Sequence, residues 1–142
     1  YIAGHGEPQS RDELLEHAFI GYIQDMIFAP GLDYLGDIHP RIRPHIQSSS
    51  IFAQLTATLS GLGLCVLPIF IAERYPELQA VLKDDVDLCR HYWIACHHDL
   101  RQVARVRTVI EFLREVVGAS RHSFTGYAEG THPVNEMAGL TA

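Results

Sequence analysis

A strand–helix–strand unit over residues 42–68 constrains the fold more than any other feature of this sequence. Residues 42–47 favour a short strand, and the apolar run from Leu64 to Pro68 predicts a second, buried one. Three serines and a mostly apolar helix lie between them, ending against Gly61 and Gly63. One face of this helix repeats at four-residue spacing: Ile51, Leu55 and Leu59. A helix joining two strands in this way predicts an α/β fold.

The segment before this unit adds a short helix and another strand. Ser10 and Glu13 have the spacing of a capping box, which predicts a helix from about Arg11 to Glu16. Residues 18–23 are apolar, aromatic and β-branched and predict a buried strand. Prolines and glycines between residues 26 and 44 break any periodicity, so an irregular segment is expected there.

The second half of the chain predicts two more strands and a long helix. The strands are expected at residues 79–82 and 92–96. Asp99 and Gln102 again have capping-box spacing, and the helix after them ends at Gly118. Its apolar face consists of Val103, Val106, Ile110, Leu113 and Val117.

Charge and composition limit the classes of function. Seventeen acidic residues against 11 basic ones give a formal charge of −6, and no dense basic cluster exists that could bind nucleic acid. The longest apolar stretch, residues 62–72, is interrupted by glycine and proline, so no membrane span is predicted. Cys65, Cys89 and Cys96 lack CxxC spacing and are expected to be reduced packing residues of a cytoplasmic protein.

Several stretches, taken in order, resemble the effector-binding domain of LysR-type transcriptional regulators. The central stretch is Gln47 to Pro68, with its serines, apolar helix, glycine-containing turn and strand ending in proline. The aromatic stretch Tyr92 to Arg101 and the helical stretch Val103 to Leu113 follow in the same order, and residues 1–22 also match. The order is more specific than any one motif, and the resemblance extends from about Tyr1 to Val117.

The resemblance implies an incomplete two-lobed domain similar to type 2 periplasmic binding proteins. Residues 1–67 would form most of the second lobe, residues 68–118 would return to the first lobe, and residues 119–142 would be a flexible tail. The winged helix-turn-helix and the opening half of the first lobe do not occur in this sequence. Because the chain also starts without Met in a strand-like Tyr1–Ala3, we expect it to be part of a larger protein.

The function implied is small-molecule sensing in a cytoplasmic, homo-oligomeric regulator. It would have no cofactor and would bind DNA only through the missing N-terminal domain. The residues implied as effector ligands are Gly21, Tyr22, Ile23, Ser48, Ser49, Ser50, Leu67 and Pro68. The serines at a helix start also suit an anionic effector on physical grounds. The alternative is that they only cap the helix.

Two other functions stay open. One is a bilobal solute-binding protein, which would need a secretory signal upstream. The other is a small metal-dependent enzyme that uses histidines, with the best local group being Cys89, His91, Cys96, His97 and His98. Strand alternation places His97 and His98 on opposite faces, and the spacing is not that of zinc sites. There is no GxSxG, P-loop or HExxH motif, so neither a metal site nor enzymatic activity is predicted.

Overall fold

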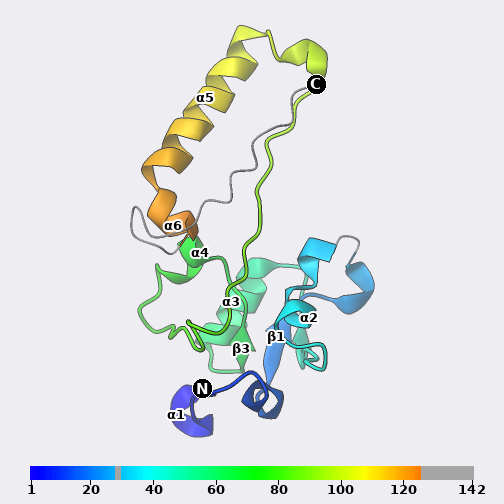
Figure 1. The fold of residues 1–142 in the computed structure, drawn as a ribbon, viewed down its shortest axis with the longest axis vertical. Coiled ribbons are helices and arrows are strands. Elements are labelled where there is room, and N and C mark those ends of the chain that lie inside the picture. The colour runs from blue at the N-terminus through cyan, green and yellow to red at the C-terminus, as the bar shows by residue number, and fades with distance from the viewer. Residues whose placement is uncertain (28–29, 126–142) are drawn as a thin grey trace. The chain divides into compact units, whose positions relative to one another are not determined.

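The computed structural model describes residues 1–27 and 30–125, which form two compact units that divide after Trp93. The first unit contains a small sheet with short helices, and the second contains the long helix α5 (Figure 1).

Three parallel strands form the sheet of the first unit. They are β1 (Phe19–Gly21), β2 (Ile46–Gln47) and β3 (Leu64–Cys65), in the spatial order β2-β1-β3. Ile20 of β1 lies opposite both Ile46 and Cys65. Because all three strands run the same way, their carboxyl ends meet at one edge of the sheet.

Helix α3 (Ile51–Leu59) connects β2 to β3 and packs against β1 and β3. The chain leaves it through Gly61, whose φ of +72° suits glycine. The predicted strand–helix–strand unit is therefore confirmed, as is the α/β class. The shorter elements of this unit are α1 (Ile2–His5), η1 (Glu13–Glu16), η2 (Gln24–Met26), η3 (Pro30–Leu32), α2 (Tyr34–Ile38) and α4 (Ile69–Ala72).

The core of the first unit lies around β1, all three residues of which are buried. Ile20 at its centre is 0% exposed. The buried apolar side chains are Leu14, Phe19, Ile20, Leu35, Ile38, Ile42 and Leu55. They come from η1, β1, α2, the loop after α2, and α3, so burial of apolar surface holds these elements together.

The second unit consists of η4 (His98–Leu100), α5 (Ala104–Ala119) and α6 (Arg121–Thr125). The predicted helix is confirmed, and it continues one residue past Gly118. Part of the predicted flexible tail is thus helical, and residues 126–142 lie outside the described residues.

Two predictions for the first half need correction. Residues 1–3 do not form a strand, because Ile2–His5 is a helical turn in which the main-chain oxygen of Tyr1 accepts from the N–H of Gly4 and His5. The strand expected at residues 42–47 shortens to Ile46–Gln47, since Pro44 has no N–H to donate to a ladder.

The second half needs three corrections. Residues 79–82 and 92–96 pair with no strand among the described residues, and Leu82 has a positive φ of 50°. Asp99 does not cap α5, because the N-cap position is Val103 and makes no side-chain cap bond. Cys89 and Cys96 are exposed instead of packed, whereas Cys65 is half-buried, and all three are free thiols.

No helix in residues 1–27 and 30–125 is long and apolar enough to cross a bilayer.

Candidate functional site

The eight predicted ligand residues follow the carboxyl ends of the three strands. Gly21 ends β1 and is buried, while Tyr22 and Ile23 after it are half-buried. The N–H of Ser48 donates to the main-chain oxygen of Gly21 at 3.0 Å. This bond joins the carboxyl end of β1 to the residue that follows β2. Leu67 and Pro68 are half-buried and follow β3.

A further hydrogen bond joins the segment after β1 to the last residue of β2. The side-chain oxygen Oε1 of Gln47 accepts from the N–H of Gln24 at 3.3 Å. Gln47 was not among the predicted ligand residues. Its bond fixes the chain directly after Ile23 at the same edge of the sheet.

The three serines have different local roles. The Oγ of Ser48 accepts from the N–H of Ser50 at 3.1 Å, and the Oγ of Ser50 accepts from the N–H of Ala53 at 3.4 Å. Ser49 is exposed, and its hydroxyl has no hydrogen-bond partner in the part of the chain that the structure describes. Capping therefore occupies Ser48 and Ser50, and Ser49 is the serine left to contact a ligand.

The first turn of α3 carries free donors. Within the described residues, the backbone N–H groups of Ile51 and Phe52 have no acceptor, as is usual for the first turn of a helix. No acidic residue lies in this turn. Free N–H groups at the positive end of the helix dipole favour an anion.

Gln54 of α3 lies in the core beneath the carboxyl edge of the sheet, and its side chain is only 1% exposed. Its Nε2 donates to the main-chain oxygen of Ser48 at 2.6 Å, and its Oε1 accepts from the hydroxyl of Tyr34 at 3.1 Å. Burial raises the pKa of Tyr34, so its hydroxyl keeps its proton. The sequence signal for this role was a polar residue beside Leu55 on an otherwise apolar helix.

Cys65 completes the contacts of Gln54, with its Sγ 3.6 Å from Oε1. Burial raises the pKa of this thiol to about 11, against a smaller opposing effect of a hydrogen bond with Thr58. The thiol is therefore neutral near pH 7, and a neutral thiol is a poor nucleophile.

A metal-dependent enzyme would need a cluster of metal ligands. In residues 1–27 and 30–125, no three His, Cys, Asp or Glu side chains are grouped so that they could hold a metal ion. His97 and His98 each lie 3.4 Å from a carboxylate oxygen of Asp99. All three side chains are largely exposed.

A wide, open hollow of about 790 Å³ also lies on the first unit. It is bounded in part by residues 75–83 and by apolar core residues such as Leu14 and Phe19. Of the eight predicted ligand residues, only Leu67 lines it. The hollow therefore meets the carboxyl edge of the sheet at Leu67 and does not include the three serines before α3.

Comparison with known proteins gives consistent results. A family model described as the LysR substrate binding domain matches residues 1–118. The HTH-type transcriptional regulator CrgA of Neisseria meningitidis serogroup C is 30% identical over 129 residues, which cover 83% of this chain and 41% of the relative. The protein of the same name from serogroup B gives the same values. The chain thus spans about two fifths of the length of these curated relatives. No solved structure matches significantly.

Proposed function

Because this chain belongs to the LysR family of transcriptional regulators, we propose that it senses a small anionic or polar organic effector at the carboxyl edge of its sheet. The observation that carries the proposal is the start of α3. There, the Ser49 hydroxyl and the N–H groups of Ile51 and Phe52 are unpaired among the described residues, and no carboxylate lies in the first turn.

In this proposal an effector anion accepts hydrogen bonds from these three donors. Ser48 and Ser50 accept from backbone N–H groups, yet each hydroxyl can still donate its own proton. The apolar part of the effector would contact the half-buried side chains after β1 and β3: Tyr22, Ile23, Leu67 and Pro68. Gly21 lets the chain pass close by, because a Cβ there would lie 2.6 Å from Leu35 Cδ1.

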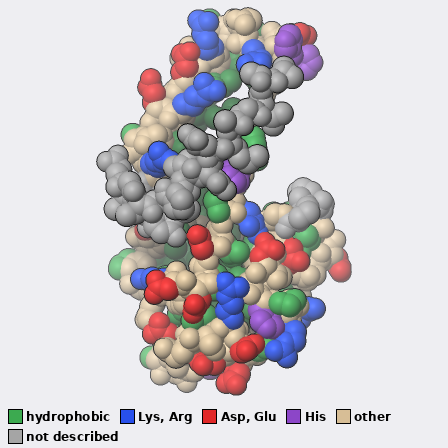
Figure 2. All heavy atoms as spheres, viewed as in Figure 1, with side chains coloured by type: hydrophobic (Ala, Val, Ile, Leu, Met, Phe, Trp, Pro, Cys, Tyr) green, Lys and Arg blue, Asp and Glu red, His purple; other side chains and the backbone are tan. Residues whose placement is uncertain are grey.

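The whole regulator, in the same proposal, is a cytoplasmic homo-oligomer that binds DNA through an N-terminal winged helix-turn-helix outside this chain. Its relatives are named HTH-type transcriptional regulators. This chain has a net charge of −6, and acidic and basic side chains are interspersed on the face shown in Figure 2. Effector binding between lobes 1–67 and 68–118 would shift populations of subunit arrangements, with no bond made or broken.

An NMR titration of the 142-residue chain tests the effector site. The probes are monocarboxylates from propionate to phenylacetate, each paired with its neutral amide. We expect at least one carboxylate, and not its amide, to shift the amide signals of Ser49, Ile51 and Phe52. Ser49→Ala should weaken that binding about tenfold, since a hydrogen bond to a charged group is lost.

Ser60→Ala is the matched control, because this serine lies at the other end of α3 and its Oγ donates to the main-chain oxygen of Thr56. It should leave the affinity unchanged. Equal shifts with acids and amides, or a Ser49→Ala variant that binds as well as the parent, would reject the site.

Sequencing the reading frame upstream of the Tyr1 codon tests the proposal that the whole protein is a DNA-binding regulator. A basic winged helix-turn-helix there supports the proposal. A secretory signal followed by a first lobe would instead make the protein a solute-binding protein.

A further inference from the structure

A second, small hollow lies on the first unit, beside the segments that lead into β1 and β2. Its volume is about 150 Å³, and its lining includes four basic side chains and no carboxylate: Leu14, Leu15, His17, Phe19, Arg41, Ile42, Arg43 and His45. These residues precede or begin the two strands, whereas the proposed effector site follows the strands. The two places are therefore at opposite ends of the sheet.

His17 is 8% exposed, and one of its two ring nitrogens contacts a neighbouring side chain. The hydroxyl oxygen of Tyr1 accepts from the N–H of Ala18 at 2.9 Å and lies 3.3 Å from Nδ1 of His17. Nδ1 of His17 therefore already has a hydrogen-bond partner, the Tyr1 hydroxyl. Nε2 of His17 has no partner within the described residues.

Nδ1 of His45 also has a hydrogen-bond partner. Its main-chain N–H donates to the oxygen of Phe19 at 2.7 Å, and its Nδ1 accepts from the N–H of Phe19 at 3.4 Å. Because Nδ1 accepts, the proton of the neutral His45 ring is on Nε2, and this donor has no partner in residues 1–27 and 30–125. Two imidazole rings thus line one hollow, one held by the Tyr1 hydroxyl and one by the N–H of Phe19, and Nε2 of each has no partner in the described residues.

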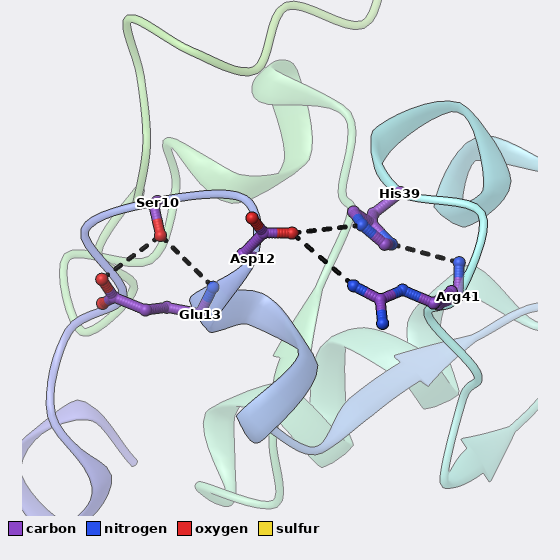
Figure 3. Close-up of polar contacts among 5 residues, drawn as sticks. All are labelled: Ser10, Asp12, Glu13, His39 and Arg41. Atoms are coloured by element: carbon purple, nitrogen blue, oxygen red, sulfur yellow. Dashed lines mark hydrogen bonds and ion pairs between the residues drawn. The ribbon is translucent and has the colours of Figure 1, made fainter.

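The arginines add positive charge that is only weakly neutralised. Arg41 Nη2 lies 3.7 Å from Asp12 Oδ1, and these side chains are 70% and 83% exposed, so the ion pair is weak. The same Asp12 oxygen also lies 3.5 Å from Nε2 of His39, as Figure 3 shows. Arg43 Nη1 is anchored at 2.7 Å on the main-chain oxygens of Pro40 and Ile42, which leaves its other N–H groups to bind an anion.

We propose that this hollow is an oxyanion site that binds one phosphate-sized group. The anion would accept from Nε2–H of His17 and His45 and from the guanidinium groups of Arg41 and Arg43. Guanidinium and imidazole N–H groups are strong donors to phosphate oxygens. Pockets for larger organic ligands usually measure about 300–1,000 Å³, so 150 Å³ suits a single small group.

Inorganic phosphate titrated into the whole chain tests the proposal, with sodium chloride of equal ionic strength as the reference. The readout is the imidazole ¹⁵N and ¹H signals of His17 and His45, which also report the tautomers. We expect saturable shifts with phosphate only. Arg41→Gln and His45→Asn should each weaken phosphate binding about tenfold. Asparagine is chosen at position 45 because its side-chain oxygen can replace Nδ1 of His45 as the acceptor for the N–H of Phe19.

Arg74→Gln is the matched control, because it removes the same charge from an exposed arginine that does not line the hollow. Its dissociation constant should equal that of the parent. Equal shifts with chloride, or an equal loss in Arg74→Gln and Arg41→Gln, would show only general ionic attraction and would overturn the site. Ser49→Ala should leave phosphate binding at His17 and His45 unchanged, so this site and the effector site can fail separately.

Discussion

The side-chain nitrogen Nε2 of Gln54 lies 2.6 Å from the main-chain oxygen of Ser48, which ties the buried side of α3 to the loop that precedes it. The same amide accepts from Tyr34 of α2 through Oε1. One buried side chain therefore connects α2, α3 and the serine loop.

Gln54→Leu should lower the free energy of unfolding by about 2–4 kcal/mol, because it leaves the Ser48 oxygen and the Tyr34 hydroxyl without their partner. Urea unfolding of parent and variant measures the difference. Thr56→Ala, an exposed position on the same helix, is the control and should change stability by less than about 1 kcal/mol. Similar losses in both variants would show that the buried amide has no special role.

Ser50→Ala should cost about 1 kcal/mol of stability, because the Oγ of Ser50 caps the N–H of Ala53. Ser49→Ala should cost almost nothing, since its hydroxyl makes no hydrogen bond among the described residues. Thermal unfolding followed by circular dichroism compares the two. If Ser49→Ala were the more damaging change, the division of roles between these serines would be wrong.

Gly63→Ala should destabilise the fold by about 1–3 kcal/mol, because the added Cβ would lie 2.5 Å from the main-chain oxygen of Ala18. That oxygen accepts from the N–H of Leu64 at 2.9 Å, next to the pairing of β1 with β3. Gly4→Ala is the control, since a Cβ there has no atom within 4 Å. Chemical denaturation should separate the two variants, and equal stability would contradict the close approach.

Cys65 should make stability fall in alkaline solution. Its pKa is raised by burial from 9.0 to about 11, so the folded chain keeps a proton that the unfolded chain loses first. The stability from this group is complete below pH 9 and is lost as the pH rises to about 11, by at most about 1.4 kcal/mol per pH unit. Urea unfolding at pH 8 and pH 10.5 should show a smaller decrease in Cys65→Ala. Equal decreases would refute the assignment.

The sheet and α3 were predictable because their signals are local. Periodic apolar residues at 51, 55 and 59, serines before them and glycines after them specify a helix without reference to the rest of the chain. Residues 79–82 and 92–96 have strand-like composition, but a strand also requires a partner with free N–H and C=O groups. Neither segment pairs with a strand in the described residues, so composition alone was insufficient.

The candidate effector residues came from the family resemblance and stay predictions, although the structure brings Gly21 and Ser48 into direct contact. Gln54 was missed because its role depends on where its amide points, and helical spacing does not specify that. The basic hollow was missed for a related reason. His17 and His45 are far apart in sequence and meet only because β1 and β2 pair in parallel.

The position of β1 in the middle of the sheet has a consequence for how the protein is made. Ile20 pairs with Ile46 and Cys65, which leave the ribosome 26 and 45 residues after it. The central strand is thus synthesised first and must wait for both neighbours. A nascent chain that stalls before Cys65 exposes one open edge of β1, which is a template for aggregation. Translation speed between residues 21 and 65 should therefore influence how much of this protein reaches the folded state.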